Sequence, residues 1–139
     1  MRRLIVGLAV GGILVSLSAC ASQPPEPIDV QLTLTDFGIE SSLTTFEVGQ
    51  PYHLVIDNQG GLKHELMVME PVMGDMEMSM EEMDETALAM IEEDELPPGT
   101  TQTLDITFTE EDAAVSLEFA CHVPGHYEAG MKLPITVAP

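Results

Sequence analysis

The sequence has no tryptophan, few other aromatic residues and very little positive charge. Aromatic residues make up 4% of the 139 residues, as four Phe and two Tyr, so the chain predicts a mainly aliphatic core. Lys and Arg together number 4 against 24 Asp and Glu, which gives a formal net charge of −20 at pH 7. A chain this acidic repels phosphate groups. Nucleic acid and anionic lipid headgroups are therefore excluded as electrostatic partners.

Cysteine is also scarce, and the first of the two cysteines ends an N-terminal targeting signal. A pair of arginines precedes an apolar run over residues 4–17, which is shorter than the roughly 20 apolar residues of a spanning helix. The run leads into Leu-Ser-Ala and Cys20, which resembles a bacterial lipobox, although an ordinary secretory signal has a similar pattern. We predict a lipoprotein signal peptide over 1–19, lipidation of Cys20 and a Pro-rich tether over 20–27. The protein would then be exported and anchored by lipid to a bacterial membrane, facing the periplasm or the cell exterior.

Residues 28–139 are predicted to form one domain built from β-strands. Six short segments alternate apolar and polar residues with a period of two, which is typical of strands with one buried face. Gly, Pro, Asn and Asp residues that favour turns separate them. This pattern indicates an all-β antiparallel sandwich. The segments are 30–34, 52–56, 64–68, 104–108, 115–119 and 133–137.

An insertion at about 70–96 departs from this pattern and is rich in methionine and acid. Methionine or alanine recurs there every three or four residues, which predicts one face of an acidic amphipathic helix between two strands. The positions in this stripe are Met73, Met76, Met80, Met83, Ala87 and Met90. Two interpretations remain open: the methionines pack the helix on the sandwich, or their thioethers bind Cu(I) as a secondary copper site. The candidates for the second interpretation are Met76, Met78, Met80 and Met83.

The second cysteine belongs to a compact motif of metal-binding side chains. Cys121, His126 and Met131 are spaced Cys-x4-His-x4-Met, and a Pro-Gly turn lies within the first interval. One further imidazole would complete the His2Cys set with a weak axial Met that marks a blue-copper site. His64 is the candidate because it follows a Gly-Gly turn and begins a predicted strand. His53 alternates with core positions and is expected to face solvent. His122 is expected to be exposed or to lie behind the ligands, and with both cysteines assigned no disulfide is predicted.

The run from Cys121 to Met131, followed by Ile-Thr-Val, resembles the cupredoxin family. Its loop spacing is similar to that of rusticyanin and auracyanin, and the nearest likeness is to small bacterial periplasmic cupredoxins of the copper-resistance type. The resemblance implies a Greek-key β-sandwich that holds one type 1 copper through His64, Cys121, His126 and Met131. It also implies a docking patch around the His126 edge, formed by Leu62, Pro124 and Gly125. Many family members carry Asn after the first ligand histidine and use it to tie two ligand loops together, whereas this chain has Glu65.

The resemblance implies a carrier that transfers single electrons through a Cu(II)/Cu(I) centre. Its partner would be a redox protein such as a cytochrome or a terminal reductase or oxidase. The alternative is a periplasmic copper-binding protein that sequesters or delivers copper in copper resistance. Because neither a substrate pocket nor an acid–base pair is evident, we expect neither an enzyme nor a small-molecule substrate. The acidity has two interpretations as well: it steers a cationic partner, or it reflects a saline habitat.

Overall fold

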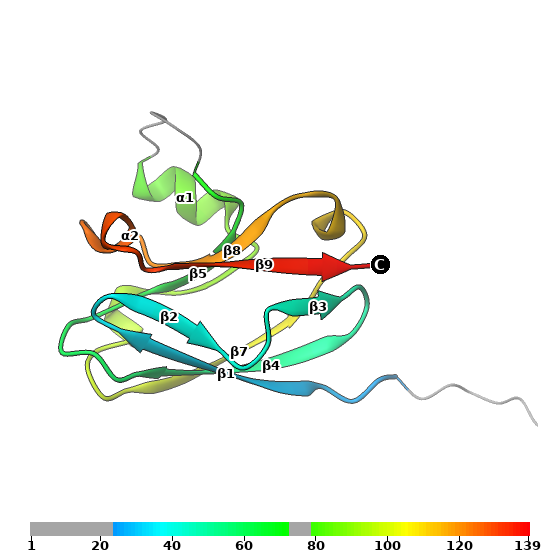
Figure 1. The fold of residues 1–139 in the computed structure, drawn as a ribbon, viewed down its shortest axis with the longest axis horizontal. Coiled ribbons are helices and arrows are strands. Elements are labelled where there is room, and N and C mark those ends of the chain that lie inside the picture. The colour runs from blue at the N-terminus through cyan, green and yellow to red at the C-terminus, as the bar shows by residue number, and fades with distance from the viewer. Residues whose placement is uncertain (1–23, 73–78) are drawn as a thin grey trace, which may run out of the picture.

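Two β-sheets packed face to face form the core of the molecule (Figure 1). The computed structural model describes residues 24–72 and 79–139. One sheet has the strand order β2 (Gly38–Ser41), β1 (Ile28–Thr35), β4 (Pro51–Asn58) and β7 (Thr101–Thr107). The other has the order β3 (Thr45–Glu47), β9 (Lys132–Ala138), β8 (Leu117–Ala120), β5 (Leu66–Met69) and β6 (Ala89–Ile91). The all-β sandwich expected from the sequence is confirmed.

The expectation of purely antiparallel sheets is wrong. Strand β1 pairs with β4 in parallel, and β3 pairs with β9 in parallel, while the remaining described pairs are antiparallel. In both parallel pairs the chain passes through the opposite sheet before it returns. Alternation of apolar residues reports which side chains face the core and carries no information on strand direction. Strands β2, β3 and β6 are too short to show a clear alternation, and none was predicted.

The core between the sheets is mainly aliphatic, as expected from the sequence, and contains one aromatic cluster. Strand β4 buries every second residue, as its alternation predicts. At the β3 side of the core, Phe46 packs against Tyr52, Phe108 and Phe119, with ring centroids 4.8–5.9 Å apart. All four rings are at most 2% exposed. Four of the six aromatic residues are thus concentrated at one place, where each ring buries a large area.

The methionine-rich insertion contains a much shorter helix than the sequence pattern suggests. Helix α1 spans Met80–Thr86 and begins at a capping box, in which Ser79 and Glu82 bond to each other's backbone N–H groups. The chain then becomes extended at Ala87, and the Leu88 N–H donates to the Val68 carbonyl at 2.8 Å. Strand β6 follows and pairs with β5, so that Met90 lies on a strand. A free edge of β5 therefore competes successfully with helix propagation.

Several predicted features lie outside the described residues. They are the signal peptide, Cys20, the first part of the tether, and Met73, Met76 and Met78 of the insertion. Residues 24–27 of the tether are exposed and irregular. No helix within residues 24–72 and 79–139 is long and apolar enough to cross a membrane.

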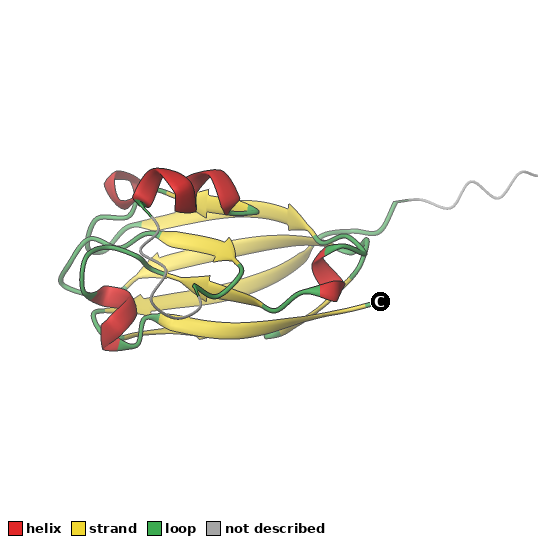
Figure 2. Cartoon of the chain, turned by 90° about the horizontal axis from the view of Figure 1, so that it is seen from above, coloured by secondary structure: helices red, strands yellow, loops and turns green. Residues whose placement is uncertain are grey.

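One end of the sandwich gathers several loops (Figure 2). The turn from β1 to β2, the loop from β4 to β5 and the loop from β8 to β9 come together there, as their mutual contacts show. The last of these loops carries helix α2 (His126–Ala129). A one-turn helix, η1 (Glu93–Glu95), and another, η2 (Asp112–Ala114), lie in other connections. The predicted type 1 ligands His64, Cys121, His126 and Met131 all belong to these loops.

Candidate metal centre

The loop from β8 to β9 closes on itself through backbone hydrogen bonds. The Cys121 N–H donates to the Met131 carbonyl at 3.0 Å, and the Met131 N–H donates to the His126 carbonyl at 3.1 Å. Two glycines with positive φ allow the chain to turn this tightly: Gly125 (φ +87°) precedes α2 and Gly130 (φ +112°) ends it. Cys121 therefore directly follows β8, Met131 directly precedes β9, and the short helix that begins at His126 lies between them.

Three donor atoms from this loop and from the His64 loop meet in the interior. His64 Nδ1 lies 3.1 Å from His126 Nδ1, and Cys121 Sγ lies 3.5 Å from His126 Nδ1 and 4.0 Å from His64 Nδ1. All three atoms lie within 4.8 Å of one another. His64 and Cys121 are fully buried, and His126 is half-buried. A thiolate and two imidazoles at this spacing surround one point, which suits a copper ion.

Met131 ends the same loop at a fully buried position. It belongs to the hydrophobic core cluster together with Cys121. A thioether at this place in the loop is the weak axial ligand that a His2Cys copper site uses. The donor set of soft sulfur and imidazole nitrogen therefore fits copper at either oxidation state.

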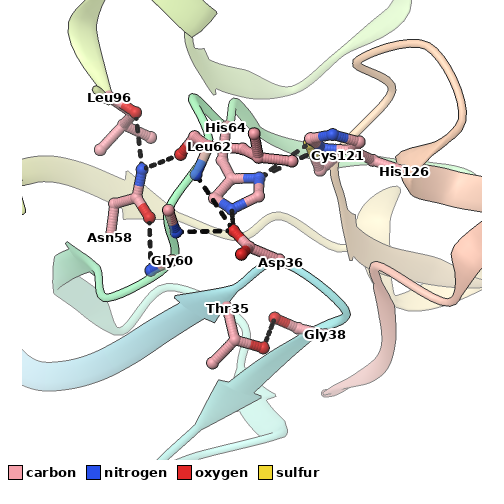
Figure 3. A network of polar contacts seen from close by, with 11 residues as sticks. Thr35, Asp36, Gly38, Asn58, Gly60, Leu62, His64, Leu96, Cys121 and His126 are labelled. Atoms are coloured by element: carbon pink, nitrogen blue, oxygen red, sulfur yellow. Dashed lines mark hydrogen bonds and ion pairs between the residues drawn. The ribbon is translucent and has the colours of Figure 1, made fainter. Parts of the chain in front are cut away.

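Asn58, at the end of β4, holds the His64 loop to the sandwich (Figure 3). Its Nδ2 donates to the carbonyls of Leu62 and Leu96 at 2.9 and 2.8 Å, and its Oδ1 accepts the Gly60 N–H at 2.9 Å. The side chain is fully buried, so every one of these bonds replaces a lost bond to water. The sequence marked 57–61 only as a turn and did not reveal this anchoring role.

Glu65 forms a hydrogen bond between the two ligand loops, although the chain lacks the Asn that the family resemblance would lead one to expect at this position. Its Oε1 accepts the His122 N–H at 2.6 Å, and the residue is only 3% exposed. Burial raises the pKa of Glu65, while the bond from His122 opposes this shift. The Glu65 carboxylate thus joins the His64 loop to the Cys121 loop.

The Cys121 sulfur receives backbone hydrogen bonds from both loops. Burial raises the pKa of the Cys121 thiol, and hydrogen bonds from the backbone N–H groups of Glu65 and Val123 act in the opposite direction. Such N–H donors stabilise a thiolate, which is the form that ligates metal. Binding of a metal ion would release the thiol proton.

The two remaining histidines do not belong to the donor group. His53 lies on the outer face of β4, as the alternation predicts, and its ring pairs with Asp105 of β7. The His122 ring is partly buried and stacks on Tyr127, with centroids 4.4 Å apart and planes at 15°. Burial lowers the pKa of His122. Nζ of Lys132 lies over the Tyr127 ring, 4.0 Å from the ring centroid.

The expected docking residues are all exposed at the loop end. Leu62 is 52% exposed, and Pro124 and Gly125 are exposed beside the half-buried His126. Phe37, in the turn between β1 and β2, is 79% exposed and was missed by the sequence analysis. Its carbonyl lies beside Gly130 of the ligand loop. A large aromatic residue within a short turn is the signal that would have drawn attention to it.

Comparison with known proteins agrees with this geometry. A family model described as copper binding proteins of the plastocyanin/azurin family matches residues 29–138. The chain belongs to this family. As a cupredoxin, it forms a type 1 copper site with His64, Cys121, His126 and Met131. The suspected family membership is thereby confirmed.

Individual relatives of this cupredoxin include proteins from several bacteria. It is 28% identical to the copper-resistant cuproprotein CopI of Pseudomonas aeruginosa, over 79% of this chain and 76% of the relative. Auracyanin of Roseiflexus castenholzii has 19% identity and a TM-score of 0.59, covering 83% of this chain and 99% of that one. Auracyanin A of Chloroflexus aurantiacus has 16% identity and a TM-score of 0.60, covering 81% and 100%. The structural likenesses support the sandwich fold.

Proposed function

We propose that this cupredoxin carries single electrons between two redox proteins. The observation that carries the proposal is the gathering of His64 Nδ1, Cys121 Sγ and His126 Nδ1 within 4.8 Å in a buried site. Copper, when bound, would supply a Cu(II)/Cu(I) couple to this donor set. The residues hold their donors in place through the loop closure at Met131 and the anchors at Asn58 and Glu65. A site that is preorganised in this way rearranges little when its charge changes, which favours fast transfer.

Electrons would enter and leave at the exposed edge of the loop end. His126 is half-buried, and Leu62, Pro124 and Gly125 around it are exposed. An apolar surface next to a ligand imidazole allows a partner to approach the metal closely without a large cost in desolvation. A cytochrome or a terminal reductase or oxidase is the kind of partner expected. The charge of −20 would attract a cationic partner at low ionic strength.

We further propose that the protein is exported and held at a bacterial membrane by lipid on Cys20. The support is the apolar run over 4–17 and the lipobox-like residues before Cys20. Mass spectrometry of protein purified from membranes tests this anchor. We expect the mature chain to begin at Cys20 and to carry acyl chains, and a Cys20→Ser variant to become soluble. An unmodified N-terminus at another residue would contradict the anchor and leave the copper site unaffected.

Copper handling is the second candidate function. It is favoured by the likeness to a copper-resistant cuproprotein and by the methionine-rich insertion. A protein of this kind would bind copper at the type 1 site and again at thioethers of the insertion, or would release copper readily to an acceptor. The candidates for the additional ligands remain Met76, Met78, Met80 and Met83.

A copper titration separates the two functions. Cu(II) is added to the soluble domain that begins at residue 28, and the thiolate-to-copper absorption band is followed together with total bound copper. A band that saturates at one equivalent, with no further copper bound, supports the electron carrier. Additional Cu(I) binding under reducing conditions, abolished when the four candidate methionines are changed to Leu, supports copper handling. A His64→Ala variant should lose the band, and its survival would contradict the ligand assignment.

A further inference from the structure

Asp36 reaches from the turn between β1 and β2 into the loop that carries His64 (Figure 3). Its Oδ1 accepts the N–H groups of Gly61 and Leu62 at 2.8 and 3.1 Å. The same oxygen lies 3.4 Å from Nε2 of His64. The carboxylate therefore faces the ligand histidine at Nε2, whereas Cys121 and His126 lie near Nδ1.

Gly60 shows how tightly this arrangement is packed. A Cβ atom at this position would lie 2.3 Å from Asp36 Oδ1 and 2.7 Å from His64 Nε2. It would also lie 3.1 Å from the backbone nitrogen of Asp36, which cannot move as a side chain does. Only glycine leaves room for the carboxylate and the imidazole to meet.

The position of the carboxylate decides which nitrogen of His64 carries hydrogen. The imidazole is fully buried, and its Nε2 has no hydrogen-bond partner within usual limits, since 3.4 Å is longer than an ordinary N–H···O bond. A nitrogen lone pair directed at a carboxylate would be repelled, whereas an N–H there is attracted. Nε2 is thus the protonated nitrogen. Nδ1, which faces Cys121 and His126, keeps the lone pair that a metal needs.

We propose that Asp36 is a positioning residue of the copper site, which sets the tautomer of His64 and uses its negative charge to favour Cu(II) over Cu(I). Carboxylates behind a metal-bound histidine orient the ring and raise its basicity in metal sites generally. A negative charge also stabilises the more positive ion, which lowers the reduction potential. Asp36 is 31% exposed, so solvent screens part of this effect. The inference rests on the copper site and not on the proposed electron transfer.

The charge is tested with Asp36→Asn in the copper-loaded full chain. Asn retains an oxygen for the loop N–H groups, so we expect the fold and the visible band to persist. The reduction potential, measured by voltammetry, should rise. Asp57→Asn is the matched control, because it removes one carboxylate from the outer end of β4, where Asp57 bonds to Gln59 and Thr101. If the reduction potential rises no further in Asp36→Asn than in the control, the electrostatic role of Asp36 is overturned. The proposed electron transfer would be unaffected by this result, because the native protein would still cycle between its redox states.

The tautomer is tested by NMR of the diamagnetic Cu(I) form. We expect a His64 Nε2–H resonance in the native protein and at least tenfold faster exchange of this proton with solvent in Asp36→Ala. Thermal unfolding of both proteins checks that the sandwich persists. An unchanged exchange rate in a folded variant would show that Asp36 does not hold the Nε2–H and would overturn the positioning role.

Discussion

Single residues at the loop end connect the copper ligands to the rest of the sandwich. Glu65 accepts the N–H of His122, Asn58 bonds to Leu96, and the carboxylate of Asp36 faces His64. Each of these side chains joins segments that are distant in sequence. Since ligand geometry depends on such contacts, substitutions behind the ligands are expected to alter the metal site as well as the stability.

Met131→Leu should retain copper and raise the reduction potential. Leu is similar in volume, so the exchange at this buried position is expected to cost less than about 1.5 kcal/mol of unfolding free energy. The thioether is lost as a weak axial ligand, which removes a donor that stabilises Cu(II). Voltammetry and the visible spectrum measure the effect. Complete loss of copper would show instead that Met131 is required to assemble the site.

Gly60→Ala should distort the contact between Asp36 and His64. The added methyl group has no room, and overpacking of this kind typically costs about 1–3 kcal/mol. We expect a lower urea midpoint and a changed visible band. Gly61→Ala is the control, because a Cβ there meets only Asp36 Oδ2 at an ordinary 3.5 Å. Equal destabilisation by both variants would contradict the close approach at Gly60.

At the scale of elements, pairing across the outer face of one sheet places His53 of β4 between Asp29 of β1 and Asp105 of β7. The hydrogen bond with Asp105 is the main cause that raises the pKa of His53, and the charges of Asp105 and Asp29 add to it. The protonated imidazole is therefore favoured in the folded state. Its contribution to stability is full below about pH 6.5 and is lost as the pH rises through the raised pKa.

His53→Gln should accordingly remove a pH-dependent part of the stability. The difference in unfolding free energy between native protein and variant is expected to shrink from about pH 6 to pH 8. Urea unfolding at several pH values measures it. Asp105→Asn serves as the control and should remove the same dependence. A difference that stays constant across this range would rule out the cross-strand pair as its source.

In the methionine-rich insertion, strand β6 forms where the local spacing of methionines predicts a helix. Ser79 and Glu82 start α1 as the sequence favours, but Leu88 bonds to β5 and the chain continues as β6. The hydrogen bonds of a sheet edge thus outweigh a helical spacing that extends to Met90. Helical propensity is a local quantity and does not include an unpaired strand nearby.

At the scale of the whole molecule, the large excess of acidic over basic residues determines the electrostatics. Lys63 pairs with Asp94 at 2.6 Å, and Lys132 lies over Tyr127, so both lysines of the chain have neighbours while most carboxylates lie on the surface. Repulsion among like charges destabilises a compact state. Salt screens this repulsion because the Debye length falls from about 30 Å at 0.01 M to about 3 Å at 1 M.

The thermal midpoint should therefore rise by several degrees between about 0.01 and 0.5 M NaCl at pH 7. Scanning calorimetry measures it. The same series near pH 4.1, the isoelectric point, is the control and should show little dependence on salt. An equal rise at both pH values would mean that net charge is not the cause.

Much of the site was predictable because it is contiguous. Cys121, His126 and Met131 lie in one loop, closed by its own hydrogen bonds, so their spacing alone indicates the ligand set. His64 was identified less directly, from a turn and from resemblance. Asp36 and the anchoring role of Asn58 escaped notice, because an Asp in a turn and an Asn in a turn are common and carry no local sign of their distant contacts.

The sequence by itself determined the sandwich class, through alternation along its longer strands, and the family, through the order and spacing of the ligand loop. Both depend on interactions within short stretches of chain. Only the tertiary structure decided the parallel pairings and the strand within the insertion. It also decided that Glu65 joins the ligand loops and that Asp36 stands behind His64. These are contacts between segments distant in sequence, and their energies depend on packing that no local pattern encodes.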